Sequence, residues 1–191
     1  MKAFWIRRGV VTAAMVAVAI GAVQWADAQR PKRQVDASPA AQITQRIGLY
    51  DVKITYARPG VKGREIWNTD LVPYDGKPRP WRAGANENTV MEFESDVIIE
   101  GKPLKAGKYG FHIIPTETKW TLIWSNDSAS WGSFTYKKEN DALRVEVTPA
   151  AAPMEEWLRY GFDDLTATSA VGYLAWEKKK ISFKVEVAPA K

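Results

Sequence analysis

The sequence predicts an all-β protein: a jelly-roll-like antiparallel β-sandwich that carries one long irregular loop. Apolar residues recur at every second position in seven separate runs, and a period of two places each apolar set on one face of a sheet. Turn-forming residues separate neighbouring runs. The spacing between successive predicted strands is often roughly 8–15 residues, which is typical of antiparallel sandwiches and barrels. No segment keeps an apolar period of 3.6 residues for long, so helices are not expected to dominate.

The seven runs follow one another along the chain. Their alternating apolar residues are Val52, Ile54 and Tyr56; Met91 and Phe93; Tyr109, Phe111 and Ile113; Trp120, Leu122 and Trp124; Leu143, Val145 and Val147; Leu158, Tyr160 and Phe162; and Ile181, Phe183, Val185 and Val187. Residues 40–47 fit either a helix or a strand, and residues 150–156 fit a single helical turn. Gly101 to Pro103 and Ala106-Gly107 bracket what we expect to be a short link.

Residues 1–28 have the pattern of a secretory signal peptide. Lys2, Arg7 and Arg8 precede an apolar stretch from residue 10 to residue 23, and Ala26-Asp27-Ala28 is a small-residue cleavage site. The apolar stretch is shorter than the roughly 18–20 residues of a spanning helix, so we expect cleavage rather than a retained anchor. The prediction is a periplasmic or extracellular protein with no membrane span after cleavage.

The rest of the chain predicts one domain. Residues 29–39 are expected to form a flexible tether, and residues 40–188 a single β-sandwich domain. Because the chain has no cysteine, its stability must come from a core rather than from disulfides.

The charge balance argues against a nucleic-acid partner. The whole chain has 27 basic and 22 acidic residues. The leader holds three basic residues and one acidic residue, so its removal leaves 24 basic against 21 acidic. Such a mixed surface is not a nucleic-acid footprint.

Residues 58–88 do not fit the strand pattern. A stretch of about thirty residues without strands is too long for an idle connection, and such loops are usually functional or disordered. This one contains Trp67, Tyr74 and Trp81, so we expect it to pack against the domain and to form the wall of a site.

The densest group of polar side chains lies at residues 81–87. Trp81, Arg82, Asn86 and Glu87 bring a ring, a guanidinium, an amide and a carboxylate to the start of a predicted strand. With Arg58 and Arg64 from the same loop, they would suit a carboxylate or phosphate ligand through bidentate hydrogen bonds. The alternative is a structural clasp, in which Arg82 pairs with a carboxylate and Asn86 bonds to the backbone.

His112 is the only histidine in the chain. Strand alternation puts it on the face opposite Phe111 and Ile113, where it would meet solvent or a cleft. It could act with Glu87 as an acid/base pair, or it could be an ordinary strand histidine.

The tryptophans divide by their surroundings. Trp120 and Trp124 share a strand face and are expected in the core, whereas Trp81 and Trp131 lie beside polar turns and could stack on sugar rings. The alternative is that these rings also fill the core.

We expect no metal site and no cofactor, with a calcium site of carboxylates and carbonyls as the open alternative. One histidine and no cysteine would leave carboxylates to supply most zinc ligands, and the oxygen-rich stretches at residues 126–128 and 163–164 lack the spacing of an EF-hand. No phosphate loop, dinucleotide fingerprint or Gly-x-Ser-x-Gly elbow is present.

Several ordered motifs resemble a known family. They are residues 56–67, 71–74, 81–87 and 106–110, together with shorter matches at Ile114-Pro115, residues 120–123, Trp131-Gly132, residues 143–145 and Trp176-Glu177. Over residues 38–187 the chain resembles a bacterial exported family known as domain of unknown function 2911. The resemblance implies a secreted, single-domain, mainly β protein and implies no activity. The spacer at residues 68–70 and the turn at residues 75–80 are longer than the family pattern.

Three functions are open at this point. The first is a binding module for a small polar or anionic ligand, such as a carbohydrate or an anionic metabolite, built from Arg58, Arg64, Trp81, Arg82, Asn86, Glu87, His112 and Trp131. The second is a hydrolase or lyase that uses Glu87 and His112. The third is a structural or envelope-interaction protein, whose protein partner the sequence does not identify.

Overall fold

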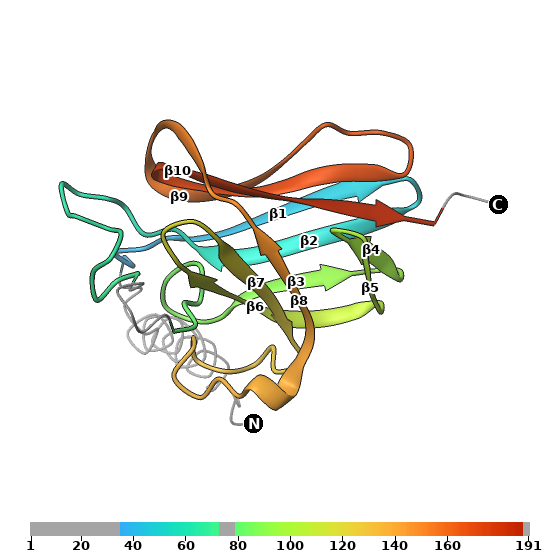
Figure 1. The fold of residues 1–191 in the computed structure, drawn as a ribbon, viewed down its shortest axis with the longest axis horizontal. Coiled ribbons are helices and arrows are strands. Elements are labelled where there is room, and N and C mark those ends of the chain that lie inside the picture. The colour runs from blue at the N-terminus through green and yellow to red at the C-terminus, as the bar shows by residue number, and fades with distance from the viewer. Residues whose placement is uncertain (1–34, 73–78, 189–191) are drawn as a thin grey trace, which may run out of the picture. The chain divides into compact units, whose positions relative to one another are not determined.

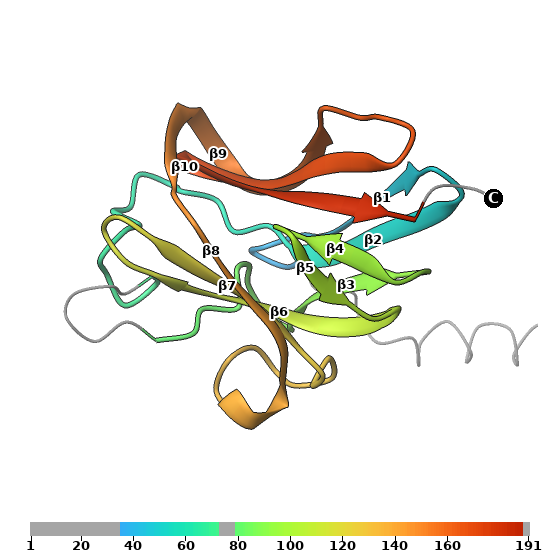
Figure 2. The same cartoon turned by 45° about the vertical axis from the view of Figure 1, so that its right-hand side comes forward.

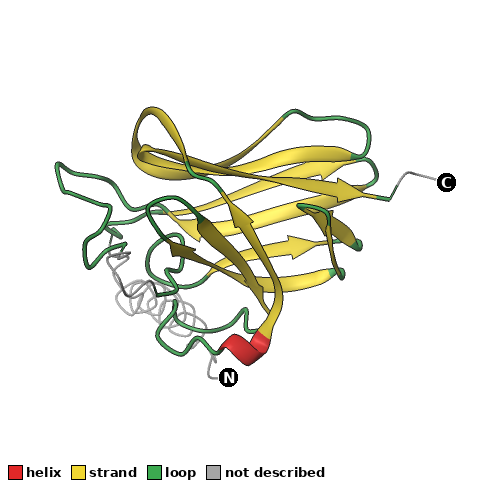
Figure 3. Cartoon of the chain, viewed as in Figure 1, coloured by secondary structure: helices red, strands yellow, loops and turns green. Residues whose placement is uncertain are grey.

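Ten strands form two antiparallel sheets in the computed structural model, which describes residues 35–72 and 79–188 (Figure 1). The predicted signal peptide, residues 29–34 of the predicted tether and most of the turn at residues 75–80 lie outside the described residues. The described residues contain no α-helix, and their helical content is one short 3-10 turn, Lys138–Asn140 (Figure 3). The predicted all-β sandwich is therefore confirmed.

The larger sheet has six strands in the order β1-β2-β3-β6-β7-β8. Their bounds are β1 Ala40–Ile47, β2 Tyr50–Ala57, β3 Thr89–Phe93, β6 Gly107–Pro115, β7 Trp120–Ser125 and β8 Asp141–Val147. Every neighbouring pair is antiparallel. Residues 40–47, which fit either a helix or a strand, form the edge strand β1.

The smaller sheet has four strands in the order β5-β4-β10-β9. Their bounds are β4 Val97–Ile99, β5 Lys102–Leu104, β9 Ala150–Asp163 and β10 Ser169–Val187. Figure 2 shows β9 and β10 as a layer over β1 and β2 of the larger sheet. The long strand β10 pairs with β9 along its first part and with β4 near its end.

The core lies between the two sheets, and the alternating apolar residues supply it. Trp120, Trp124 and Phe183 are at most 1% exposed, which confirms that the first two are core residues. Rings from both sheets meet there: Phe183 lies 5.6 Å from Trp124 and 6.1 Å from Phe111 between ring centroids. Large aromatic groups thus fill the sandwich of a chain that has no disulfide.

Two local predictions were wrong. Residues 150–156 are the first half of β9 and not a helical turn. Their side chains are exposed or half-buried, so they show no alternation to read as a strand. The short link at residues 101–107 contains β5, which pairs with β4 around a turn where Glu100 and Gly101 have positive φ. These strands have three residues each, too few to show a period.

The long loop is anchored on β9, where that strand departs from regular pairing. The register slips between Ala175 and Glu177 of β10, and Trp157 of β9 bridges to Gly60 of the loop instead. The amide of Val61 donates to the carbonyl of Glu156 (2.8 Å), and the amide of Leu158 donates to that of Pro59 (3.0 Å). The bulged backbone of β9 therefore satisfies its hydrogen bonds on the loop.

From Asp36 onwards the chain forms one compact unit. No helix within residues 35–72 and 79–188 is long and apolar enough to cross a membrane.

Candidate functional site

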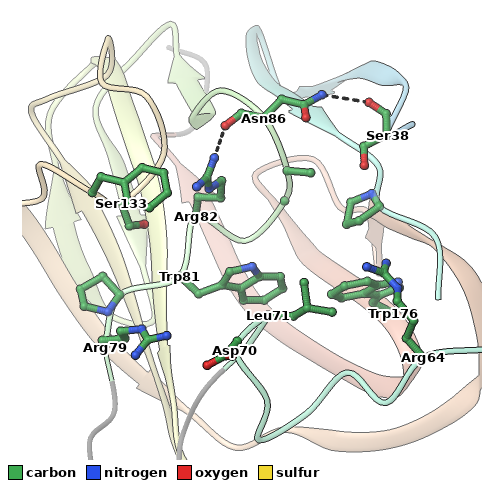
Figure 4. Close-up of a pocket in the computed structure, with 15 residues that line it drawn as sticks. Ser38, Arg64, Asp70, Leu71, Arg79, Trp81, Arg82, Asn86, Ser133 and Trp176 are labelled. Atoms are coloured by element: carbon green, nitrogen blue, oxygen red, sulfur yellow. Dashed lines mark hydrogen bonds between the residues drawn. The ribbon is translucent and has the colours of Figure 1, made fainter. Parts of the chain in front are cut away.

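A pocket of about 450 Å³ opens where the long loop meets the loop after β7 (Figure 4). This size falls within the range of small-molecule sites. Its charged lining residues are Arg64, Arg79, Arg82 and Asp70. Ser38, Asn86 and Ser133 add polar groups, and Leu71, Trp81, Phe134 and Trp176 add apolar ones. Of the site residues predicted in the long loop, Arg64, Trp81, Arg82 and Asn86 line this pocket, and the others do not.

The floor of the pocket is a cluster of tryptophans. Trp81 stacks on Trp176 with an interplanar angle of 16° and 5.9 Å between ring centroids. Trp67 lies against both of them and against Trp120. Trp81 is held by a pair of backbone hydrogen bonds with Ile113 of β6, at 2.7 and 2.8 Å. It is 8% exposed, so only a small part of the ring is available to a ligand.

The segment 81–88, here called the site loop, is fixed by hydrogen bonds from distant parts of the chain. The hydroxyl of Tyr160 in β9 donates to the carbonyl of Ala83 (2.8 Å), which also accepts from the Thr89 hydroxyl (3.2 Å). The side-chain amide of Asn86 donates to the carbonyl of Ser38 (3.2 Å). Ala83 and Asn86 both have positive φ, which asparagine adopts readily but which alanine keeps only where the surroundings enforce it.

Arg82 is half-buried, and backbone and rings hold it rather than a carboxylate. Its Nη1 donates to the carbonyl of Asn86, and its guanidinium lies 4.9 Å from the ring centroid of Phe134. No acidic side chain of the described residues lies within salt-bridge distance of it. Burial lowers the pKa of Arg82 from its ordinary value. The guanidinium stays charged, because the ordinary pKa of arginine is far above neutral pH.

Arg64 reaches the pocket from the part of the loop anchored on β9. Its Nε donates to the carbonyl of Val61 (3.1 Å) and its Nη2 to that of Gly60 (2.5 Å), so the backbone orients an exposed side chain. Arg79 enters from the other side of Trp81 (Figure 4). Asp70 is the one carboxylate among the described lining residues.

The strand alternation predicted that His112 would face solvent or a cleft, and this prediction was wrong. His112 is 2% exposed, because residues 126–137 cover the outer face of β6, and its Nδ1 is hydrogen-bonded to the Ser133 hydroxyl at 2.8 Å. Burial lowers the pKa of His112 to about 4, against the opposing charges of Asp141 and Asp127. The ring is therefore neutral near pH 7, and its hydrogen-bond partner Ser133 lines the pocket.

The remaining predicted site residues lie outside this pocket. Arg58 is used structurally, since its Nε donates to the carbonyl of Leu158 (2.9 Å). Glu87 is exposed, makes no hydrogen bond to another described residue and does not line the pocket. Trp131 is 58% exposed and is not among the lining residues. Neither Glu87 nor His112 lines this pocket.

Of the two contacts expected in a structural clasp at residues 82–87, one is present. Asn86 does bond to the backbone, whereas Arg82 pairs with a backbone carbonyl and not with a carboxylate.

Seven of the lining residues named above were not predicted: Ser38, Asp70, Leu71, Arg79, Ser133, Phe134 and Trp176. Three of them, Asp70, Leu71 and Arg79, belong to the long loop, so their position in the sequence was a usable signal. The others come from the end of the predicted tether, from the loop after β7 and from β10, and no local pattern links them to the site loop. The described residues contain no group of three His, Asp or Glu side chains that could hold a metal ion.

The family described as "Protein of unknown function (DUF2911)" matches residues 38–185 of the chain. The chain therefore belongs to the DUF2911 family, as the motifs indicated. No curated protein and no solved structure matches the chain significantly. The class that fold and family define is thus a β-sandwich domain whose activity is not established.

Proposed function

We propose that this protein is an exported binding module for a small anionic or polar ligand, and that the pocket beside the site loop holds that ligand. The observation that carries the proposal is that three guanidinium groups, from Arg64, Arg79 and Arg82, line one pocket that has a single described carboxylate. Guanidinium groups bind carboxylates and phosphates through paired, charge-assisted hydrogen bonds.

The way Arg82 is held supports this assignment. Arg82 is half-buried, and its guanidinium contacts Phe134 and a backbone carbonyl but no carboxylate of the described residues. Such a group has lost part of its hydration without gaining an anionic partner, which makes an anion a favourable addition. The tied site loop also reduces the ordering that binding would cost.

The same geometry gives less support to an enzyme that uses Glu87 and His112. Neither side chain lines the pocket, and a histidine with a pKa of about 4 is a poor base at neutral pH. The exposed rings of Phe134 and Trp131, 80% and 58% exposed, favour contact with a partner or a larger ligand beside the pocket.

Intrinsic fluorescence and thermal unfolding test the proposal, because Trp81 and Trp176 line the pocket. The purified protein is titrated with acetate, benzoate, citrate, inorganic phosphate and glucuronate. A ligand that binds only the folded state raises the melting temperature by mass action. The expected result is a saturable shift with at least one anion that disappears in Arg82→Gln. The absence of any saturable response to these anions would overturn it.

A further inference from the structure

The charges that line the pocket do not cancel. Among its described lining residues there are three guanidinium groups and one carboxylate, so the site carries an excess of positive charge. Arg64, Arg79 and Arg82 form no salt bridge within the described residues. A monoanion would leave part of this charge uncompensated, whereas a dianion would match it.

The guanidinium groups are spread around the pocket rather than gathered at one point. Figure 4 shows Arg79 and Arg64 on opposite sides of Trp81, with Arg82 on a third side below Asn86. They come from the two ends of the long loop and from the site loop, and the backbone orients two of them. One compact anionic group cannot make paired hydrogen bonds at separated guanidinium groups, whereas two separated anionic groups can pair with two of the three.

The space between the guanidinium groups is lined by apolar groups and one carboxylate. Trp81 and Leu71 lie at the centre of the close-up with Asp70 beside them, and the exposed ring of Phe134 lies on the Arg82 side. A ligand that reaches from one guanidinium to another must cross these groups. A flat or hydrocarbon spacer would bury apolar surface there, whereas a strongly hydrated spacer would lose its water.

We infer that the pocket selects small dicarboxylates whose two carboxylates are held apart by a flat, apolar spacer. Arg82, the one half-buried guanidinium of the three, binds the first carboxylate. Arg64 or Arg79 binds the second. This inference rests on the proposed function and adds the class of ligand.

Isothermal titration with four matched compounds tests the inference. Terephthalate carries two separated carboxylates, benzoate carries one, phenyl phosphate carries its charge on one group, and benzamide is neutral. Terephthalate is expected to bind at least about tenfold more tightly than benzoate, because it gains a second charge-assisted pair. Benzamide is expected to bind more weakly than benzoate.

Variants assign the two carboxylates. Arg82→Gln is expected to weaken both terephthalate and benzoate. Arg64→Gln or Arg79→Gln is expected to weaken terephthalate towards the affinity of benzoate and to leave benzoate unchanged. Lys108→Gln is the control, because it removes an exposed positive charge that does not line the pocket. Melting temperatures show that each variant is folded.

The outcomes separate the inference from the proposed function. Equal affinity for terephthalate and benzoate, or tighter binding of phenyl phosphate, would overturn the dicarboxylate inference and leave an anion site in place. If none of the three anions binds better than benzamide, the proposed function fails with it. A loss of terephthalate affinity in Lys108→Gln as large as in Arg79→Gln would also overturn the inference, because general attraction would then explain the binding.

Discussion

At the scale of single residues, His112 is a buried base that folding keeps neutral. Its pKa of about 4 lies below the ordinary value near 6.5 because burial disfavours the charged ring. A depressed histidine pKa means that the unfolded chain binds the proton more readily than the folded chain. The contribution to stability is therefore complete above about pH 6.5 and is lost as the pH falls towards 4.

We predict that the His112 imidazole titrates near pH 4 in the folded protein. Because the chain has one histidine, a proton NMR titration of protein without a polyhistidine tag reports this group without assignment. Acidification from pH 7 to pH 4 should cost on the order of 3 kcal/mol of unfolding free energy through this group. His112→Gln should lack that part of the pH dependence, and a titration near pH 6.5 would contradict the prediction.

Gly132 is the second informative residue, because Arg82 lies directly over it. A Cβ atom at this position would come within 2.3 Å of the Arg82 guanidinium carbon, and φ is +64°. Gly132→Ala should lower the unfolding free energy by ~1–2 kcal/mol from backbone strain, and by more from the clash with Arg82. It should also weaken anion binding.

Gly101→Ala is the matched control for that prediction. Gly101 has φ +76° but no neighbouring atom within 4 Å of a Cβ, so it measures backbone strain alone. Urea denaturation of both variants separates the two effects. Equal losses in the two variants would show that Arg82 moves aside freely.

The residues of the site loop also show what the sequence could and could not reveal. Arg82 and Asn86 are close in the chain, so their local contact was visible as a polar cluster. Trp176 joins the pocket from β10, about a hundred residues later, and no local pattern signals it. His112 was placed on the correct face of its strand. Its burial was not predicted, because the loop that covers it has no regular apolar pattern.

At the scale of elements, the decisive contact is that between β9 and the site loop. Tyr160 is buried in β9 and donates its hydroxyl to the carbonyl of Ala83. Burial raises the pKa of Tyr160 well above its ordinary value, so the hydroxyl remains a donor at all working pH values. This one bond links the smaller sheet to the segment that presents Arg82.

We predict that Tyr160→Phe lowers the unfolding free energy by about 1–2 kcal/mol, because the bond is removed inside the core. It should also weaken anion binding by loosening the site loop. Tyr50→Phe is the control, since the Tyr50 hydroxyl makes no hydrogen bond to another described residue. Thermal and urea unfolding, with a ligand titration, measure both effects, and unchanged affinity in Tyr160→Phe would show that the loop keeps its shape without this bond.

Strand prediction succeeded where buried apolar residues mark a strand and failed where a strand is exposed or very short. β2, β3 and β8 alternate clearly because the core lies on one side of them. The first half of β9 has no buried residue, so its side chains show no apolar alternation from which the strand could be predicted. The position of that strand depends on β10 and on the long loop, which are distant in sequence.

At the scale of the whole molecule, the pattern of residues 1–28 predicts how the protein is processed. We expect the chain to be exported and cut after Ala28, so that the mature protein begins at Gln29. Intact-mass analysis of protein recovered outside the cytoplasm checks this. A mass that still includes residues 1–28 would contradict cleavage and would favour a retained anchor.

The bulge in β9 has a consequence for how this family can change its length. In a regular strand, one inserted or deleted residue turns every later side chain to the wrong face. Between Glu155 and Arg159 the backbone leaves β10 and pairs with residues 59–61. Insertions there, and matching ones in the long loop, can be absorbed without reversing the buried face at Tyr160. Relatives could thus acquire differently sized pockets on an unchanged sandwich.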